Sequence, residues 1–224
     1  MLSIVSTPIG NLEDMTLRAI RTLKEVDLIA SEDTRHTGRL LKHFEITTPQ
    51  ISFHAHSGQA KLDKIIAALH DNQHVALVSD AGTPGISDPG YLLIRRAIEE
   101  GIKVEPIPGP SALLAALVTS GLPMDKFVYL GFLPTKKGRK TLLEGLKDES
   151  RTIILYESPH RLQKTLKNLM EYGFQDHQLV IARELTKLHE TIYRGLVSEL
   201  AQTLENQKLK GEMVLVLHKN TKSS

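Results

Sequence analysis

The first 110 residues alternate short apolar runs with longer amphipathic stretches, and this alternation constrains the fold more than any other feature of the chain. The apolar runs predict strands at residues 2–7, 27–31, 51–54, 75–79 and 104–107. Helical periods lie between them at residues 16–26, 37–44, 61–70 and 91–100. Strands separated by helices pair in parallel, because each helix carries the chain back to the start of the next strand. The alternation therefore predicts a mainly parallel sheet.

The pattern changes after residue 120. A predicted helix at residues 111–120 precedes short strands at 127–131, 152–156, 179–183, 191–195 and 212–218, with helices at 139–146, 159–172 and 197–205. The last four strands share only two long helices, which predicts a mixed sheet. We therefore predict an α/β protein with two α/β domains, residues 1–120 and 121–224, and a ligand cleft between them.

Composition excludes several classes of protein. A chain of 224 residues with 41% hydrophobic and 24% charged residues is typical of a globular protein. The absence of cysteine excludes disulfide scaffolds, thiolate zinc sites and iron–sulfur clusters, and favours a cytoplasmic location. The longest apolar run, residues 112–118, is far shorter than the roughly 20 residues that cross a bilayer, and no signal peptide is seen. We expect no membrane role, and no cluster of side chains at ligand spacing predicts a metal site.

Charge is unevenly distributed along the chain. Residues 1–120 carry 11 Lys and Arg against 14 Asp and Glu, whereas residues 121–224 carry 17 against 12. Four cations, Lys136, Lys137, Arg139 and Lys140, occupy one short loop, which favours a polyanionic partner. An ordinary solvated surface is the alternative for this loop. The five tyrosines, five phenylalanines and absence of tryptophan argue against binding of single strands by base stacking.

Loops rich in Gly, Pro, Ser, Thr or Asp follow the predicted strands of the first half. The ligands of open α/β sheets bind at the carboxyl ends of strands, so the loops at 7–11, 31–36, 79–84 and 108–112 are expected to converge. Residues 78–90 hold three glycines and two prolines, a composition that is costly to order without a binding role. Asp80 is placed to accept hydrogen bonds from a ribose or to neutralise an ammonium group. No phosphate-binding glycine pattern is present, which argues against NAD, FAD and ATP.

Six segments in this order resemble the tetrapyrrole methylase superfamily, and within it the branch that methylates ribosomal RNA. They are residues 7–14, 30–37, 77–90, 106–112, 156–161 and 211–216. The resemblance implies two α/β domains, a cleft that binds S-adenosylmethionine, and a homodimer. It also implies transfer of a methyl group to the ribose 2′-hydroxyl of a cytidine in 16S ribosomal RNA of the small subunit. The first loop is less glycine-rich than in the corrin and siroheme branches, which counts against a tetrapyrrole substrate.

The resemblance also places the contacts to S-adenosylmethionine. In the first domain they fall on Pro8, Ile9, Gly10, Asp80, Ala81, Gly82, Thr83, Ser111 and Ala112. In the second they fall on Phe132, Tyr156, Ala182 and Met213. Ser111 has an equally good structural role as the cap of the helix that follows it.

Charged residues at strand ends are the candidates for catalysis, because a ribose hydroxyl needs a proton acceptor or a cation that stabilises the developing alkoxide. We expect Glu184 or Glu157 to be the base, with Glu32 and Asp33 as further candidates. Arg183 or Arg35 is expected to orient the ribose phosphate, although Arg35 could instead pair with Asp33. Contacts to RNA phosphates are expected from the four cations of the loop and from Arg161.

Three other functions are compatible with these patterns. A methyltransferase of the same superfamily could act on a tetrapyrrole or on a protein residue. A module that binds RNA or the cofactor without turnover would bind but release no methylated product. A hydrolase on an α/β scaffold has little support, because no nucleophile elbow is seen.

Overall fold

The computed structural model describes residues 1–54, 57–88 and 90–220. The chain forms two compact units, Met1–Ser111 (unit 1) and Ala112–Ser224 (unit 2). The sequence pattern placed the domain boundary at residue 120, whereas in the structure it lies at residue 111. The difference arises because the helix α5 (Ala112–Ser120) packs on the sheet of unit 2. Leu113, Ala116 and Leu117 of this helix are buried.

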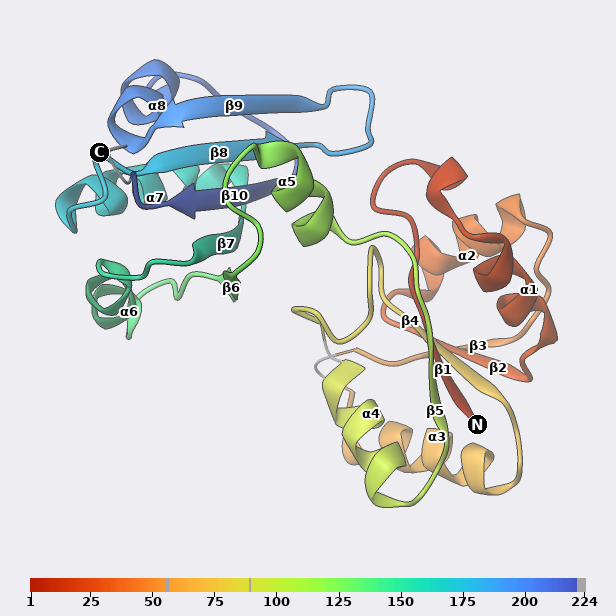
Figure 1. Cartoon of the computed structure of the whole chain (residues 1–224). Helices are drawn as coiled ribbons and strands as arrows, with labels where there is room; N and C mark the ends of the chain where they lie inside the picture. The colour runs from red at the N-terminus through yellow and green to blue at the C-terminus, as the bar shows by residue number, and fades with distance from the viewer. Residues whose placement is uncertain (55–56, 89, 221–224) are drawn as a thin grey trace. The chain divides into compact units, whose positions relative to one another are not determined.

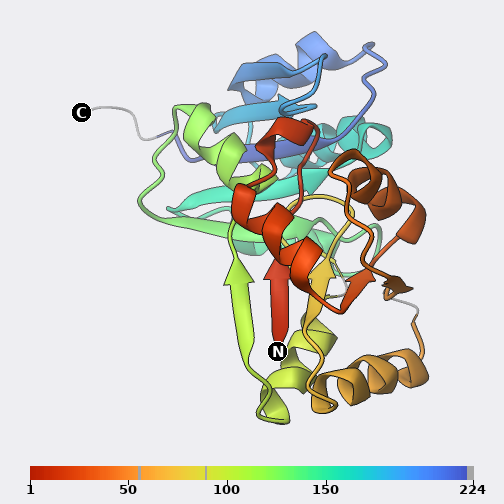
Figure 2. The same cartoon turned by 90° about the vertical axis from the view of Figure 1, so that its right-hand side faces the viewer.

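Unit 1 is built on a five-stranded sheet of order β3-β2-β4-β1-β5, in which all four pairs of neighbouring strands are parallel. Its strands are β1 (Leu2–Val5), β2 (Leu28–Ser31), β3 (Gln50–Ser52), β4 (Val75–Val78) and β5 (Val104–Ile107). Its helices are α1 (Leu17–Glu25), α2 (Thr34–His43), α3 (Gln59–His70) and α4 (Gly90–Glu99), with a short 3-10 helix at Leu12–Asp14. Figure 2 shows β5, β1 and β4 running side by side in one direction. The predicted parallel sheet is confirmed.

Helices cover both faces of this sheet. Figure 1 shows α1 and α2 on one side and α3 and α4 on the other. Two apolar clusters correspond to the two layers: Leu23 and Leu40 belong to one, and Ile65 and Leu93 belong to the other. The central strand β4 is buried at every position, as expected for a parallel strand that is covered on both faces. This packing fixes the carboxyl ends of the strands, where the polar loops begin.

Unit 2 has a mixed five-stranded sheet of order β6-β7-β10-β8-β9. Its strands are β6 (Phe127–Phe132), β7 (Thr152–Glu157), β8 (Gln178–Arg183), β9 (Thr191–Leu196) and β10 (Met213–His218). Its other helices are α6 (Arg139–Leu146), α7 (Pro159–Glu171) and α8 (Val197–Leu204). The pair β6–β7 is parallel and the other pairs are antiparallel, which confirms the predicted mixed sheet.

The core of unit 2 lies between its sheet and the helices α6, α7 and α8. Leu143, Leu166 and Leu200 represent the three helices in this core, and Leu155 and Leu215 represent the sheet. Of the helices in the described part of the chain, none is both long enough and apolar enough to cross a membrane.

Candidate functional site

Hydrogen bonds join three loops at the carboxyl end of the unit 1 sheet. Thr7, after β1, and Gly82, after β4, exchange two backbone hydrogen bonds, with N···O distances of 2.9 and 3.0 Å. The hydroxyls of Ser6 and Thr83 lie 3.0 Å apart. Thr83 Oγ1 also donates to the carbonyl oxygen of Pro110, after β5, at 3.2 Å. The predicted convergence of these loops is therefore confirmed.

Glycines allow the loops to approach one another this closely. A Cβ atom at Gly109 would lie 2.9 Å from Cβ of Ser6, closer than real side chains pack. Gly82 has φ of +79°, a conformation that side chains rarely adopt, and a Cβ there would contact Ile9. At these two glycines, which we call the glycine cradle, the backbone of the loops is therefore bare of side chains.

Hydrogen bonds to carboxylates join the loop after β2 to the loop after β4 at the same edge of the sheet. The amide of Asp33 donates to Oδ1 of Asp80 at 3.1 Å, and the amide of Asp80 lies 3.5 Å from Oε2 of Glu32. Burial raises the pKa of Glu32, and the negative charge of Asp80 raises it further. A cation bound here would relieve this repulsion, so the donor set fits a positively charged ligand.

Arg35 is already paired. Its guanidinium donates twice to the Asp33 carboxylate, at 2.9 and 3.2 Å, and this hydrogen bonding holds the pKa of Asp33 well below its ordinary value. The Asp33 side chain also caps α2. The pairing considered as an alternative is thus present, while the Arg35 side chain remains 87% exposed. A contact from Arg35 to a ribose phosphate stays a prediction.

The other cofactor contacts expected in this region follow the same strands. Pro8, Ile9 and Gly10 come after Thr7, and Ala81 precedes Gly82. Ile9 is buried, whereas Gly10 and Ala81 are exposed. Ser111 is the last residue of unit 1, and Ala112 is the first of unit 2.

Three of the contacts expected from unit 2, those of Phe132, Tyr156 and Ala182, lie in one row across its sheet. Phe132 pairs with Tyr156, Tyr156 with Val214, and Val214 with Ala182, on four adjacent strands. Met213, the neighbour of Val214 on β10, pairs with Glu157 and Arg183, and its buried side chain belongs to the apolar core of unit 2. The Phe132 ring is half exposed and meets the Tyr156 ring edge to face, with centroids 5.7 Å apart. The structure therefore brings these predicted residues together at one end of the unit 2 sheet.

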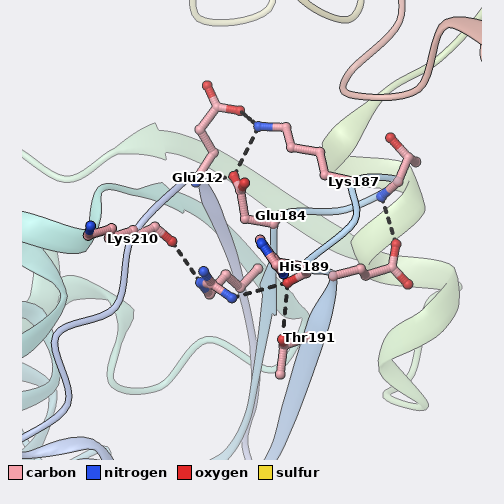
Figure 3. Close-up of polar contacts among 9 residues, drawn as sticks. Glu184, Lys187, His189, Thr191, Lys210 and Glu212 are labelled. Atoms are coloured by element: carbon pink, nitrogen blue, oxygen red, sulfur yellow. Dashed lines mark hydrogen bonds and ion pairs between the residues drawn. The ribbon is translucent and has the colours of Figure 1, made fainter.

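Polar contacts fix the loop between β8 and β9, which begins directly after Arg183 (Figure 3). Lys187 Nζ lies between two carboxylates, 3.0 Å from Oε1 of Glu184 and 2.7 Å from Oε2 of Glu212. The amide of Glu212 donates to the same Glu184 oxygen at 2.9 Å. Glu184 and Thr186 have φ of 52° and 66°, a strained conformation for residues with side chains. These contacts hold the loop in that conformation.

Two predicted catalytic residues, Arg183 and Glu184, form hydrogen bonds that fix this loop. Arg183 donates from Nε to the Lys210 carbonyl at 2.7 Å and from Nη1 to the His189 carbonyl at 3.1 Å. Burial by itself would raise the pKa of Glu184, but the hydrogen bonds from Glu212 and Lys187 outweigh it and lower the pKa. A carboxylate with a lowered pKa is a weaker base, so the arrangement argues against Glu184 as proton acceptor.

The prediction of Glu157 as a base needs correction. Its side chain is 1% exposed, and its Oε1 accepts from the Ser158 amide at 2.9 Å and lies 3.3 Å from Arg161 Nε. Its Oε2 accepts a hydrogen bond from Thr165 Oγ1. A buried carboxylate with both oxygens engaged cannot reach a ribose hydroxyl, so we assign Glu157 a structural role.

The cationic loop divides into exposed and buried members. Lys136, Lys137 and Lys140 are exposed, which is compatible with phosphate contacts. Arg139 is 5% exposed and donates to protein acceptors, so the prediction that it contacts RNA is wrong. The Arg161 side chain is 26% exposed, so part of it stays available. Within the described ranges, no group of side chains could hold a metal ion.

Sequence reasoning missed Glu212, Thr165 and Asn168. Glu212 lies in the segment 211–216 and was not singled out within it. Thr165 and Asn168 follow Arg161 at spacings of four and seven residues on α7, which places all three on one helix face. That spacing is the signal that could have linked them.

Comparison with known proteins adds sequence relatives. A family model described as tetrapyrrole (corrin/porphyrin) methylases matches residues 1–201. The chain is 56% identical to a Synechocystis protein named ribosomal RNA small subunit methyltransferase I, over 97% of this chain and 78% of the relative. Relatives with the same name are 49% identical in Thermotoga maritima, over 96% and 97% of the two chains, and 50% identical in Escherichia coli O157:H7, over 96% and 77%.

Solved structures share the fold. Uroporphyrin-III C-methyltransferase from Thermus thermophilus, complexed with S-adenosylhomocysteine, superposes with a TM-score of 0.68 at 17% identity, covering 97% of this chain and 96% of that one. A diphthine synthase superposes with a TM-score of 0.74 at 15% identity, covering 98% and 90%. At these identities the likeness concerns the fold.

Proposed function

Because the chain belongs to the tetrapyrrole methylase family, we propose that it methylates a cytidine ribose 2′-hydroxyl in 16S ribosomal RNA with S-adenosylmethionine. The observation that carries this proposal is identity near 50% over almost the whole chain with methyltransferases of small-subunit ribosomal RNA. The small ribosomal subunit as substrate, a homodimer as the active form and a cytoplasmic location are parts of the same proposal.

The rim of unit 1 fits the positive charge of the cofactor. Glu32 and Asp80 form an anionic edge beside the glycine cradle of Gly82 and Gly109. We expect residues 8–10 and 80–83 of unit 1 to hold the cofactor together with Ser111. Contacts to the cofactor from Ala112, Phe132, Tyr156, Ala182 and Met213 stay predictions from the family resemblance. S-adenosylmethionine supplies a methyl group on a sulfonium, which becomes a neutral thioether when the methyl leaves. Side chains lower the barrier of such a displacement mainly by aligning the ribose oxygen with the methyl group and the sulfur, and by excluding water.

Glu32 is the acid that best fits the role of proton acceptor. Methyl transfer from the cofactor would remove the proton of the ribose 2′-hydroxyl, and a carboxylate of the protein would accept that proton. The raised pKa of Glu32 makes it a stronger base than Glu184, whose pKa is lowered. Unlike Glu157, Glu32 is partly exposed, so it can meet a ligand.

We expect Glu32→Gln to weaken binding of S-adenosylmethionine by about 10-fold. Binding of S-adenosylhomocysteine, which lacks the sulfonium charge, should change less, because the lost interaction is electrostatic. For the parent, affinity for S-adenosylmethionine should fall as the pH drops through the raised pKa of Glu32 and the carboxylate becomes neutral. Calorimetric titration with both ligands across pH measures these effects. Glu99→Gln, an exposed acid at the end of α4, is the control; equal losses for both ligands would contradict the charge argument.

We expect Lys136→Ala and Lys137→Ala to weaken RNA binding and to reduce the salt dependence of its affinity by about one unit of slope each. The reason is that each lysine releases counterions when it neutralises a phosphate. Affinity for small ribosomal subunits measured between 50 and 200 mM salt (roughly the range in which the effect is large) tests this. Lys208→Ala removes an exposed lysine elsewhere on unit 2 and should leave the slope unchanged. Equal slopes for all three variants would disprove the contact.

One experiment tests the proposed function as a whole. The protein is incubated with methyl-labelled S-adenosylmethionine and small ribosomal subunits from cells that lack this gene, and nucleosides are analysed by mass spectrometry. We expect label in 2′-O-methylcytidine. Cofactor binding without labelled nucleoside would redirect the search to other RNAs, proteins or tetrapyrroles.

A further inference from the structure

Three cationic side chains bind backbone carbonyl groups of the loop that carries Lys136 and Lys137. Arg161 donates from Nη2 to the carbonyl oxygen of Leu133. Arg139 Nη1 donates to the carbonyl oxygen of Pro134 at 3.2 Å. Lys164 Nζ lies 3.5 Å from the carbonyl oxygen of Thr135. Three successive carbonyl groups are therefore bound by the protein, and the two lysines that follow them are exposed.

Arg139 is the central member of this set. Its Nε donates to Oδ1 of Asn168 at 2.8 Å, and its Nη2 donates to Oγ1 of Thr165 at 2.7 Å. Both acceptors lie on α7, whereas Arg139 is the first residue of α6. The guanidinium thus connects the loop, the start of α6 and the face of α7. Its planar shape, with donors pointing in several directions, is suited to such a junction, and a lysine ammonium is not.

The carboxylate of Glu157 is linked to Arg139 through Thr165. Thr165 Oγ1 accepts from Arg139 and donates to Oε2 of Glu157, so the hydroxyl links the two charges. The other oxygen of Glu157 faces Arg161. Arg161 thus faces the buried carboxylate directly and Arg139 reaches it through Thr165, so this cluster of two cations and one anion keeps a net positive charge. Burial lowers the pKa of Arg139, and the charge of Glu157 opposes that effect.

We propose that Arg139 is a positioning residue, which holds residues 133–138 in the shape that presents Lys136 and Lys137 to RNA phosphates. This inference rests on the proposed RNA function. Ordering a flexible loop upon binding costs free energy, so a loop that is ordered beforehand binds more tightly with the same phosphate contacts. Arg139 should therefore influence affinity without contributing a phosphate contact of its own.

Salt dependence separates positioning from contact. We expect Arg139→Met to weaken binding to small ribosomal subunits on the order of 10-fold, with the salt slope of the parent. Lys137→Ala should instead reduce the slope by about one unit. Arg139→Lys should restore only part of the affinity, because an ammonium cannot reach all three acceptors.

A second readout requires no RNA. Trypsin cleaves after lysine only where the chain can open, so cleavage after Lys136 and Lys137 reports the order of the loop. We expect Arg139→Met to increase the rate of this cleavage by about 5-fold. Asn168→Ala, which removes one acceptor from a partly exposed position, should have a smaller effect in the same direction. Lys167→Ala, at an exposed position of the same helix, is the control and should be cleaved in this loop like the parent.

Thermal unfolding and calorimetric affinity for S-adenosylmethionine show whether each variant folds. If Arg139→Met fails to fold, Asn168→Ala tests the inference in its place. A lower salt slope for Arg139→Met with unchanged cleavage would mean that Arg139 itself contacts phosphate, and the inference would be wrong. Unchanged affinity and cleavage would overturn it as well. If the lysine variants bind like the parent, the RNA role of the loop fails and this inference fails with it. If the lysine variants behave as expected and Arg139→Met does not, only this inference fails.

Discussion

Replacing Glu157 by alanine is expected to lower the free energy of unfolding by about 3 kcal/mol, the cost of removing one partner from a buried ion pair. The carboxylate is nearly inaccessible to solvent and faces Arg161, while Thr165 links it to Arg139. Its removal leaves positive charge in the protein interior without compensation. For a chain of this size the melting temperature should fall by roughly 6–12 °C. Thermal and urea unfolding followed by circular dichroism measure the change.

Two variants test the reason for this loss. Glu157→Gln keeps an oxygen acceptor and removes the charge, so we expect an intermediate loss of about 1–2 kcal/mol. Glu144→Ala removes an acid whose side chain is 53% exposed and lies 3.7 Å from Lys140, and it should cost less than about 0.5 kcal/mol. A loss for Glu157→Ala as small as that for Glu144→Ala would contradict a buried, compensating charge.

Replacing Gly109 by alanine is expected to weaken binding of S-adenosylmethionine by about 100-fold. A displacement of binding groups by about 1 Å can cause a loss of this size. The added Cβ would lie 2.9 Å from Cβ of Ser6, which is fixed beside the backbone and cannot swing away. The loops after β1 and β5 must then separate. Their separation would disturb the contacts of Ser6 and Pro110 with Thr83. Calorimetric titration measures the affinity.

The matched control for this substitution is Gly145→Ala in α6. Nothing lies within 4 Å of a Cβ atom at Gly145, and its position in a helix favours alanine by about 1 kcal/mol. Cofactor affinity should therefore stay at the parent value. If Gly109→Ala folded and bound the cofactor like the parent, the cradle would have no part in binding.

Much of the fold could be predicted from the sequence. The periods of the first 110 residues gave the order of strands and helices along unit 1, whereas the order of the strands within the sheet, with β4 at its centre, came from the structure. The ratio of strands to helices predicted the mixed sheet of unit 2. The family resemblance, which the motifs carried, is confirmed by the family model. The helix α5 was assigned to the wrong side of the boundary, because its apolar residues fit either core and local pattern does not tell which sheet they cover.

The candidate site was predictable in part. The loops after β1, β4 and β5 were expected to meet, since parallel strands end at one edge, and the hydrogen bonds of Thr7, Gly82 and Thr83 join them. The choice among acids was not predictable. Glu32, Glu157 and Glu184 all follow or end strands, yet their surroundings give them a raised pKa, a buried structural role and a lowered pKa respectively.

The sequence by itself determined where strands, helices and polar loops occur, because periodicity records whether a residue faces a core or water. Only the tertiary structure decided what each charged side chain does. Arg139 and Lys137 are neighbours in one cationic run, but the first is buried against Thr165 and Asn168 and the second is exposed. The acceptors that bury Arg139 come from a helix that lies more than 20 residues away in the chain. Burial of a charge depends on such distant partners, and no local pattern contains them.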